Sequence, residues 1–140
     1  MSRNSVIHFI EYRNRCAKEI ILSRDLKVLY AEDEELTRML LSRQLIREFK
    51  EVYTAENGME ALSIFKERMP DILITDLAMP VMNGYDLVRE AKKIKSNVIV
   101  IIMSAYKNDS IDLKADFILS KPIVIQDILS TVDSVTVNKS

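Results

Sequence analysis

The stretch "VIVIIMSAYK", residues 98–107, begins as an apolar run and stops at a hydroxyl. Residues 98–103 carry no polar side chain, and Ser104 follows them directly. An apolar run of this length predicts a strand covered on both faces, which is typical of a parallel sheet between helices. Ser104 fits plain turn chemistry, and it also fits a functional site at the carboxyl end of the strand. The rest of the chain decides between these two interpretations.

Strand and helix patterns alternate on both sides of this run. Four further strands are predicted, at 27–31 ("KVLYA"), 51–55 ("EVYTA"), 71–75 ("DILIT") and 117–120 ("FILS"). Helices are predicted where apolar residues recur at helical spacing: Leu36, Met39, Leu40, Ile46 and Phe49; Ala61, Leu62, Phe65 and Met69; Leu87, Val88, Ala91 and Ile94; and Ile125, Ile128, Leu129 and Val132. Asn57 and Glu60 have the capping-box spacing at the start of the second helix. The alternation predicts an α/β fold with a parallel sheet and right-handed crossovers.

Composition bounds the class of protein. The 140 residues are 48% apolar and 29% charged with only two Gly and three Pro, which predicts one globular domain. A formal net charge of −1 lacks the basic excess of a nucleic-acid binder, so we expect no nucleic-acid partner. Cys16 is the single cysteine and cannot form an internal disulfide, which fits a reducing, cytoplasmic location. No apolar stretch is long enough to span a membrane, and the N-terminus lacks a signal peptide's continuous core.

Polar residues follow four of the five predicted strands. They are 32–35 ("EDEE") after the first strand, Asp76 after the third, Ser104 after the fourth and Lys121-Pro122 after the fifth. In an open parallel sheet such residues meet at the carboxyl edge, where sites form. Clustered carboxylates suit Mg²⁺, and a hydroxyl and an ammonium beside them suit phosphoryl oxygens. Each residue alone also fits a capping, turn or surface role, but their conjunction at strand ends favours a site.

The chain resembles the receiver domain of two-component response regulators, including the chemotaxis regulators. The matching pieces are "VLYAEDEE", "AENGMEAL", "PDILITDLAMPVMNGYDL", "IIMSAY" and "ILSKPI", of which the third is the most specific. The resemblance implies a flavodoxin-like, doubly wound, five-stranded sheet with strand order 2-1-3-4-5 over residues 27–136. It places an N-terminal helical extension or linker at 1–26 and a frayed tail at 137–140.

The resemblance also implies a role for each site residue. Asp76 matches the aspartate that accepts a phosphoryl group from a histidine kinase. Asp33 matches the acid that binds Mg²⁺ directly, Glu32 matches its neighbour that acts through a metal-bound water, and the backbone carbonyl of Ala78 matches the third protein ligand. Two further residues would contact the phosphoryl group: Ser104 and Lys121. We also expect a cis peptide bond between Lys121 and Pro122, as receivers of this kind commonly have.

The function implied is a phosphorylatable, Mg²⁺-dependent switch that takes its phosphoryl group from a histidine kinase or phosphotransfer protein and signals to a downstream protein. It would not be an enzyme beyond its own phosphorylation and autodephosphorylation. The alternative is a degenerate receiver-like docking module within a hybrid kinase or larger regulator. A flavin protein is disfavoured because residues 31–35 ("AEDEE") would repel its phosphate, and an aspartate-nucleophile phosphatase places its nucleophile after the first strand. The sequence leaves open whether the chain acts alone or belongs to a longer protein.

Several positions depart from the family pattern. Ile118 stands where receivers usually carry the aromatic ring of their switch; we expect it to stay buried in both states and the 105–116 segment to carry the signal. Ser104 and Lys121 are 17 positions apart (121 − 104), which predicts a shortened fourth helix. Tyr106 stands where side chains can obstruct the hydrolytic water. The region 1–26 has apolar residues at helical spacing, which suits either an extra helix packed on the domain or a dimerising helix; His8 there is the lone histidine, without neighbours for a metal site.

Overall fold

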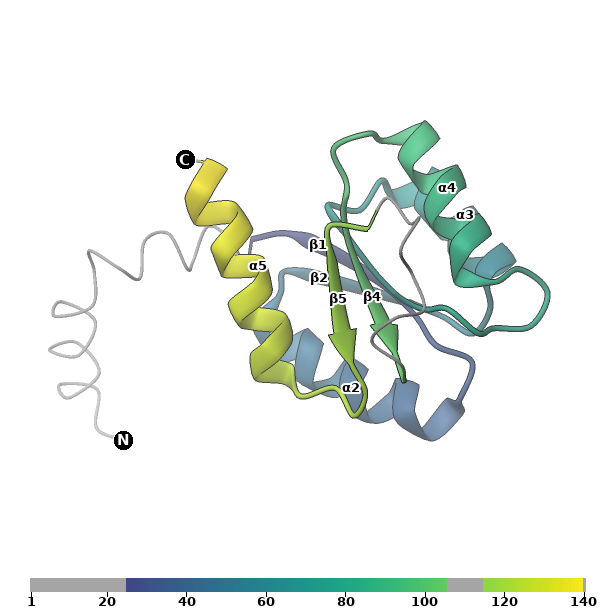
Figure 1. Ribbon diagram of the computed structural model, residues 1–140, viewed down its shortest axis with the longest axis horizontal. Helices are drawn as coiled ribbons and strands as arrows, with labels where there is room; N and C mark the ends of the chain where they lie inside the picture. The colour runs from purple at the N-terminus through teal and green to yellow at the C-terminus, as the bar shows by residue number, and fades with distance from the viewer. Residues whose placement is uncertain (1–24, 106–114, 140) are drawn as a thin grey trace, which may run out of the picture.

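The computed structural model describes residues 25–105 and 115–139, which form a five-stranded sheet with helices on both faces (Figure 1). The strands are β1 (Lys27–Ala31), β2 (Glu51–Ala55), β3 (Ile72–Asp76), β4 (Ile99–Ser104) and β5 (Phe117–Ser120). The described helices are α2 (Glu35–Glu48), α3 (Gly58–Arg68), α4 (Gly84–Ile94) and α5 (Ile125–Lys139). The expected extra N-terminal helix and shortened fourth helix fall at residues 1–24 and 106–114, outside the described residues.

All neighbouring strands are parallel, in the order β2-β1-β3-β4-β5. This confirms the predicted flavodoxin-like topology. Every residue of β3 and β4 is buried, because these strands lie in the middle of the sheet and are covered on both faces. The strand order reverses direction between β1 and β3, so the carboxyl ends of these two strands flank the crevice where ligands bind in such folds.

Two apolar cores cover the two faces of the sheet. Helices α3 and α4 bury residues such as Phe65 and Leu87 against one face, and α2 and α5 bury residues such as Leu45 and Ile128 against the other. The two helix layers lie on opposite sides of the strands (Figure 1). Alternate residues of β1 enter opposite cores: Leu29 packs towards α3 and α4, and Tyr30 packs towards α2 and α5.

The helix termini follow the local sequence. The side chains of Asn57 and Asn83 accept hydrogen bonds from the backbone N–H groups of Glu60 (2.8 Å) and Asp86 (3.0 Å), so they cap α3 and α4. The helix start expected at Asn57 is therefore confirmed. α5 continues to Lys139, three residues beyond the receiver boundary expected at 136. None of the helices in the described ranges is long and apolar enough to cross a membrane.

The buried face of α2 differs from the one expected. The expected stripe included four residues whose side chains are in fact exposed by 57%, 41%, 52% and 61%: Leu36, Met39, Leu40 and Ile46. The helix instead buries Leu41 and Leu45 against the sheet, and Phe49 just after its end. α2 carries apolar residues on both faces. The spacing of apolar residues therefore predicted that a helix forms here but could not predict which face packs against the sheet.

Candidate functional site

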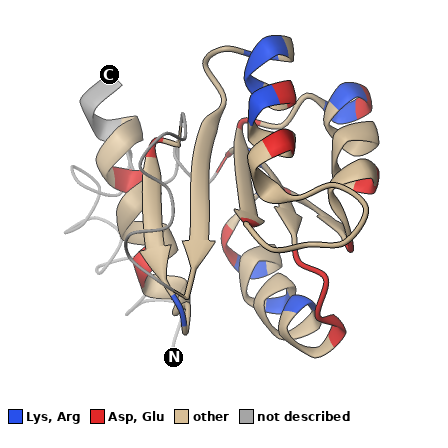
Figure 2. Ribbon diagram, turned by 45° about the vertical axis from the view of Figure 1, so that its right-hand side comes forward, with Lys and Arg blue, Asp and Glu red and all other residues tan. Residues whose placement is uncertain are grey.

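The acidic segment after β1 and the ends of β3, β4 and β5 meet at the carboxyl edge of the sheet. Figure 2 shows the acidic segment after β1 as a continuous red stretch at this edge. Strand register explains the meeting, because Asp76 at the end of β3 is paired with Met103 of β4, and Ser104 of β4 is paired with Ser120 of β5. Residues that are far apart in the chain therefore form one site.

Three carboxylates converge at this edge. Glu32, Asp33 and Asp76 each offer an oxygen, and these oxygens all lie within 4.8 Å of one another. The side chains of Glu32 and Asp76 are buried, whereas Asp33 is exposed. This arrangement confirms the predicted convergence. Oxygen donors at this spacing fit a divalent cation, and Mg²⁺ in particular accepts a few carboxylates and keeps its remaining ligands as waters.

Lys121 brings the positive charge to the cluster. Its ammonium donates a hydrogen bond to Asp76, and its Nζ lies 3.7 Å from Oε1 of Glu32. The backbone N–H of Lys121 donates to the carbonyl of Ser104 at 2.8 Å, which ties the end of β5 to the end of β4. The peptide bond between Lys121 and Pro122 is cis, as predicted.

Ser104 and Ala78 complete the predicted set. Ser104 is buried as the last residue of β4, one position beyond the residue paired with Asp76. Ala78 lies in the exposed connection from Asp76 to α4. The N–H of Gly84 donates to the carbonyl of Leu77 at 2.8 Å, which holds this connection against the start of α4.

The electrostatics of the site follow from burial and proximity. Burial raises the pKa of Glu32 to about 7, assisted by the hydrogen bond with Asp33 and the charge of Asp76, while the backbone N–H of Glu34 and the charge of Lys121 act in the opposite direction. Burial alone would lower the pKa of the Lys121 ammonium, but the hydrogen bond and charge of Asp76 outweigh it and raise the pKa. The three carboxylates of the cluster face one ammonium, that of Lys121. A bound divalent cation would relieve the remaining repulsion between the carboxylates.

Two residues that sequence reasoning missed support the end of β1. Arg38 in the first turn of α2 donates through Nη1 to the carbonyl of Glu32 at 2.8 Å, and its Nη2 lies 3.7 Å from Oε2 of Glu56. Tyr30 is fully buried directly before the acidic segment, and burial together with the charges of Glu32 and Asp76 raises the pKa of its hydroxyl, which is therefore neutral. A charged residue on a helix and an aromatic residue in a strand are too common to mark a site by themselves.

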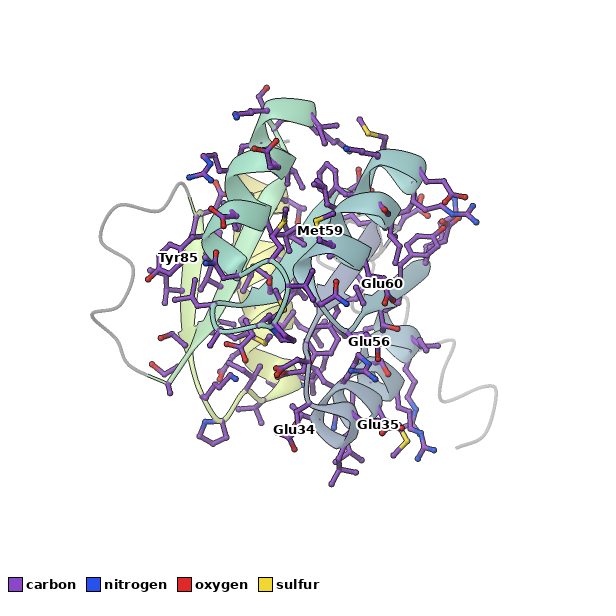
Figure 3. The ribbon with its side chains drawn as sticks, turned by 90° about the vertical axis from the view of Figure 1, so that its right-hand side faces the viewer. Glu34, Glu35, Glu56, Met59, Glu60 and Tyr85 are labelled. Atoms are coloured by element: carbon purple, nitrogen blue, oxygen red, sulfur yellow. The ribbon has the colours of Figure 1, made fainter. Side chains whose placement is uncertain are left out.

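The rim of the site is acidic. Figure 3 shows Glu34 and Glu35 at the start of α2, and Glu56 and Glu60 beside the start of α3, along the same side of the molecule. Glu34 also turns its backbone N–H to Oε2 of Glu32, at 3.2 Å. Of the acids that follow β1, the buried Glu32 and the exposed Asp33 belong to the cluster, and the exposed Glu34 and Glu35 lie around it.

Ile118 stands where receivers usually carry the aromatic ring of their switch, and its side chain is more exposed than the sequence predicted. Ile118 is 41% exposed, so the expectation that it is buried is wrong for this structure. Its neighbours in β5, Phe117 and Leu119, pack into the core beneath α2 and α5, which leaves Ile118 on the opposite face. Tyr106 and most of the segment 105–116 lie outside the described residues.

Comparison with known proteins identifies the family of this site. The model of the response regulator receiver domain matches residues 28–133. The chain is 32% identical over 111 residues to sporulation initiation phosphotransferase F of Bacillus subtilis, covering 76% of this chain and 90% of that protein. It is 36% identical over 115 residues to the probable transcriptional regulator ycf27 of Guillardia theta, covering 79% of this chain and 44% of that protein, so it spans less than half of that relative.

A solved structure agrees with these sequence matches. The response regulator protein TrrA of Thermotoga maritima, solved in complex with Mg²⁺-BeF, is 32% identical and superposes with a TM-score of 0.70 over 77% of this chain and 96% of that one. The fold, the strand order and the carboxylates at the sheet edge are those of the same class of signalling domain. This chain therefore belongs to the family of response regulator receiver domains of two-component signalling.

Proposed function

We propose that the chain is a phosphorylation switch in which Asp76 accepts a phosphoryl group from a histidine kinase or a phosphotransfer protein. The observation that carries this proposal is the convergence of Glu32, Asp33 and Asp76 with Lys121 hydrogen-bonded to Asp76. The names of the relatives support it, since one is a phosphotransferase and another was solved with Mg²⁺-BeF.

In the proposed reaction a carboxylate oxygen of Asp76 attacks the phosphorus atom of a phosphohistidine. The new O–P bond forms as the P–N bond breaks, and the donor imidazole leaves with its electron pair and takes up a proton. Lys121 stabilises the negative charge on the transferred oxygens, and the buried Ser104 hydroxyl supplies a hydrogen-bond donor beside them. Asp33, Glu32, Asp76 and the carbonyl of Ala78 would hold Mg²⁺, which supplies charge neutralisation of the phosphoryl oxygens.

The proposed output is a change of partner rather than turnover of a substrate. The chain would transfer its state to a downstream protein and lose the phosphoryl group by hydrolysis, so it is not an enzyme in the usual sense. A degenerate docking module would lack some of the acceptor, metal or ammonium groups. Here these groups are present together at one edge of the sheet, which favours the switch.

Mass measurement of the intact protein tests this proposal. After incubation with acetyl phosphate and Mg²⁺, we expect the mass to increase by one phosphoryl group. The variant Asp76→Asn should gain nothing, and Asp127→Asn, at an exposed position in the first turn of α5, should be modified like the natural chain. Unmodified natural protein under conditions where TrrA is modified would instead support the docking module.

A further inference from the structure

A pocket of about 600 Å³ opens between α2 and the junction of β5 with α5. The fully buried Tyr30 and Met103 form its deepest lining, and Leu40, Leu41 and Ile123 contribute apolar walls. This volume lies in the range of small-molecule sites, which combine apolar walls with a few polar groups. The pocket adjoins the phosphoacceptor cluster through Glu32 and Lys121, but most of its lining belongs to α2 and to the segment after Lys121.

The Tyr30 hydroxyl points to a ligand. It is the one buried side-chain oxygen or nitrogen without a hydrogen-bond partner among residues 25–105 and 115–136, whose side chains are described. A phenolic hydroxyl can donate one hydrogen bond and accept another, and leaving both capacities unused in a buried place costs free energy. A molecule whose polar end reaches the deep part of the pocket would supply the missing partner.

Two more polar side chains face the same space without a partner of their own. Thr37 and Gln44 both line the pocket from α2, and neither makes a side-chain hydrogen bond within the part of the chain described here. The hydroxyl and the amide can each donate and accept. Together with Tyr30 they offer uncharged hydrogen-bonding groups beside apolar walls.

Charge determines which class of molecule fits. Glu32 and Glu34 line the pocket and disfavour an anion, and the ammonium of Lys121 is already engaged by Asp76 and lies 3.7 Å from Glu32. The charges of Glu32 and Asp76 reach the Tyr30 hydroxyl, but the Lys121 ammonium already lies against both carboxylates. A second cation in the deep end, between Tyr30, Leu41 and Met103, would be repelled by Lys121 and would lose its hydration among apolar side chains.

We propose that this pocket binds a small uncharged molecule with an apolar body and an amide-like hydrogen-bonding end. The carbonyl of the ligand accepts from the Tyr30 hydroxyl, its N–H donates back to Tyr30 or to Gln44, and its body packs between Leu40 and Ile123. This binding site is formed in the unphosphorylated chain.

Benzamide is a suitable probe, with benzoate and benzamidine as anionic and cationic molecules of nearly the same shape. Binding is followed by amide chemical-shift changes in the isotopically labelled full chain without Mg²⁺. We expect benzamide to shift the amides of α2, Lys121 and Ile123 and to bind more tightly than either charged molecule. Shifts centred elsewhere, tighter binding of benzamidine or benzoate, or no shifts at saturating benzamide would overturn the proposal.

Two conservative variants test the contacts. Tyr30→Phe keeps the ring and should weaken benzamide about fivefold, the factor for one neutral hydrogen bond. Thr37→Val keeps the volume and tests the wall formed by α2, where a smaller loss is expected. Tyr53→Phe is the matched control, because that hydroxyl is bonded to Glu51 and lies outside the pocket. Equal benzamide affinity in the natural chain and Tyr30→Phe would contradict the assignment.

Discussion

Tyr30 near the end of β1 and Glu32 just after the strand are buried polar residues with different roles. Glu32 is buried at the carboxyl edge, where the N–H of Glu34 and the ammonium of Lys121 approach it. Tyr30 lies two residues earlier on the same face, and no described group bonds its hydroxyl. Glu32 has polar partners, although burial still disfavours its charged form, whereas the Tyr30 hydroxyl has no partner. The two residues should therefore respond differently to substitution.

Tyr30→Phe should stabilise the unliganded protein. Removing a buried hydroxyl that has no partner eliminates its desolvation penalty and retains the packing of the ring, so the free energy of unfolding should rise by about 1 kcal/mol. Urea denaturation of the natural chain and the variant measures the change. In Tyr53→Phe the lost hydroxyl has a partner, Glu51, so no such gain is expected. A clear loss of stability in Tyr30→Phe would mean that the hydroxyl is bonded in solution.

Glu32 should make stability depend on pH when Mg²⁺ is absent. Its folded-state pKa is raised from 4.5 to about 7, so between these values the folded chain binds more protons at this residue than the unfolded chain does. The contribution of Glu32 to the free energy of unfolding therefore falls as the pH rises through this window. Subtracting the stability of Glu32→Gln from that of the natural chain at each pH should reveal this decline. Glu35→Gln, at an exposed acid, is the control, and parallel curves for Glu32→Gln and the natural chain would contradict the prediction.

At the scale of elements, the start of α4 is set directly against the end of β3. A Cβ added at Gly84 would lie 2.3 Å from the carbonyl oxygen of Asp76 and 2.9 Å from Cα of Leu77. Only glycine allows this approach, and the obstructing atoms are backbone, which cannot turn aside. The position of the acceptor residue therefore depends on the packing of a helix that follows it in the chain.

Gly84→Ala should move the end of β3 and weaken both stability and phosphorylation. Overpacking of this kind typically costs about 1–3 kcal/mol, and a displaced Asp76 loses its alignment with Lys121. Urea denaturation and the initial rate of modification by acetyl phosphate measure the two effects. Val81→Ala, at a 79% exposed position of the same connection, should leave the rate unchanged. A normal rate in Gly84→Ala would show that the site tolerates the shift.

The elements also show what a sequence can and cannot predict. Continuous apolar runs such as 98–103 predicted the buried strands β3 and β4 correctly, whereas the strand order was implied by the resemblance to receiver domains. α2 carries apolar residues on opposite faces, and only packing against the sheet selects Leu41 and Leu45 over Leu40 and Ile46. The unpaired hydroxyl of Tyr30 depends on groups from α2 and β4 that no local pattern encodes.

At the scale of the whole molecule, the two helix layers leave the carboxyl edge of the sheet as the place where charge accumulates. The cores beneath α3 and α4 and beneath α2 and α5 consist mainly of apolar side chains, whereas the buried polar or charged residues gather at or next to the strand ends: Glu32, Thr75, Asp76 and Ser104. Convergent carboxylates repel one another, so the folded state is strained electrostatically until a cation binds. Stability and metal binding should therefore be linked.

Mg²⁺ should stabilise the natural chain, and removing Asp33 should abolish that response. A ligand that binds only the folded state adds about 2.7 kcal/mol at one hundred times its dissociation constant. Asp33→Asn removes an exposed carboxylate from the cluster, so this variant should be more stable than the natural chain in chelator and should gain nothing from Mg²⁺. Thermal unfolding with and without Mg²⁺ separates the loss of carboxylate repulsion from the loss of metal binding. In chelator Asp33→Asn should be the more stable protein, and in Mg²⁺ the natural chain should be. Glu35→Gln, an exposed acid outside the cluster, should respond to Mg²⁺ like the natural chain, and an equal response in Asp33→Asn would place the ion away from this carboxylate.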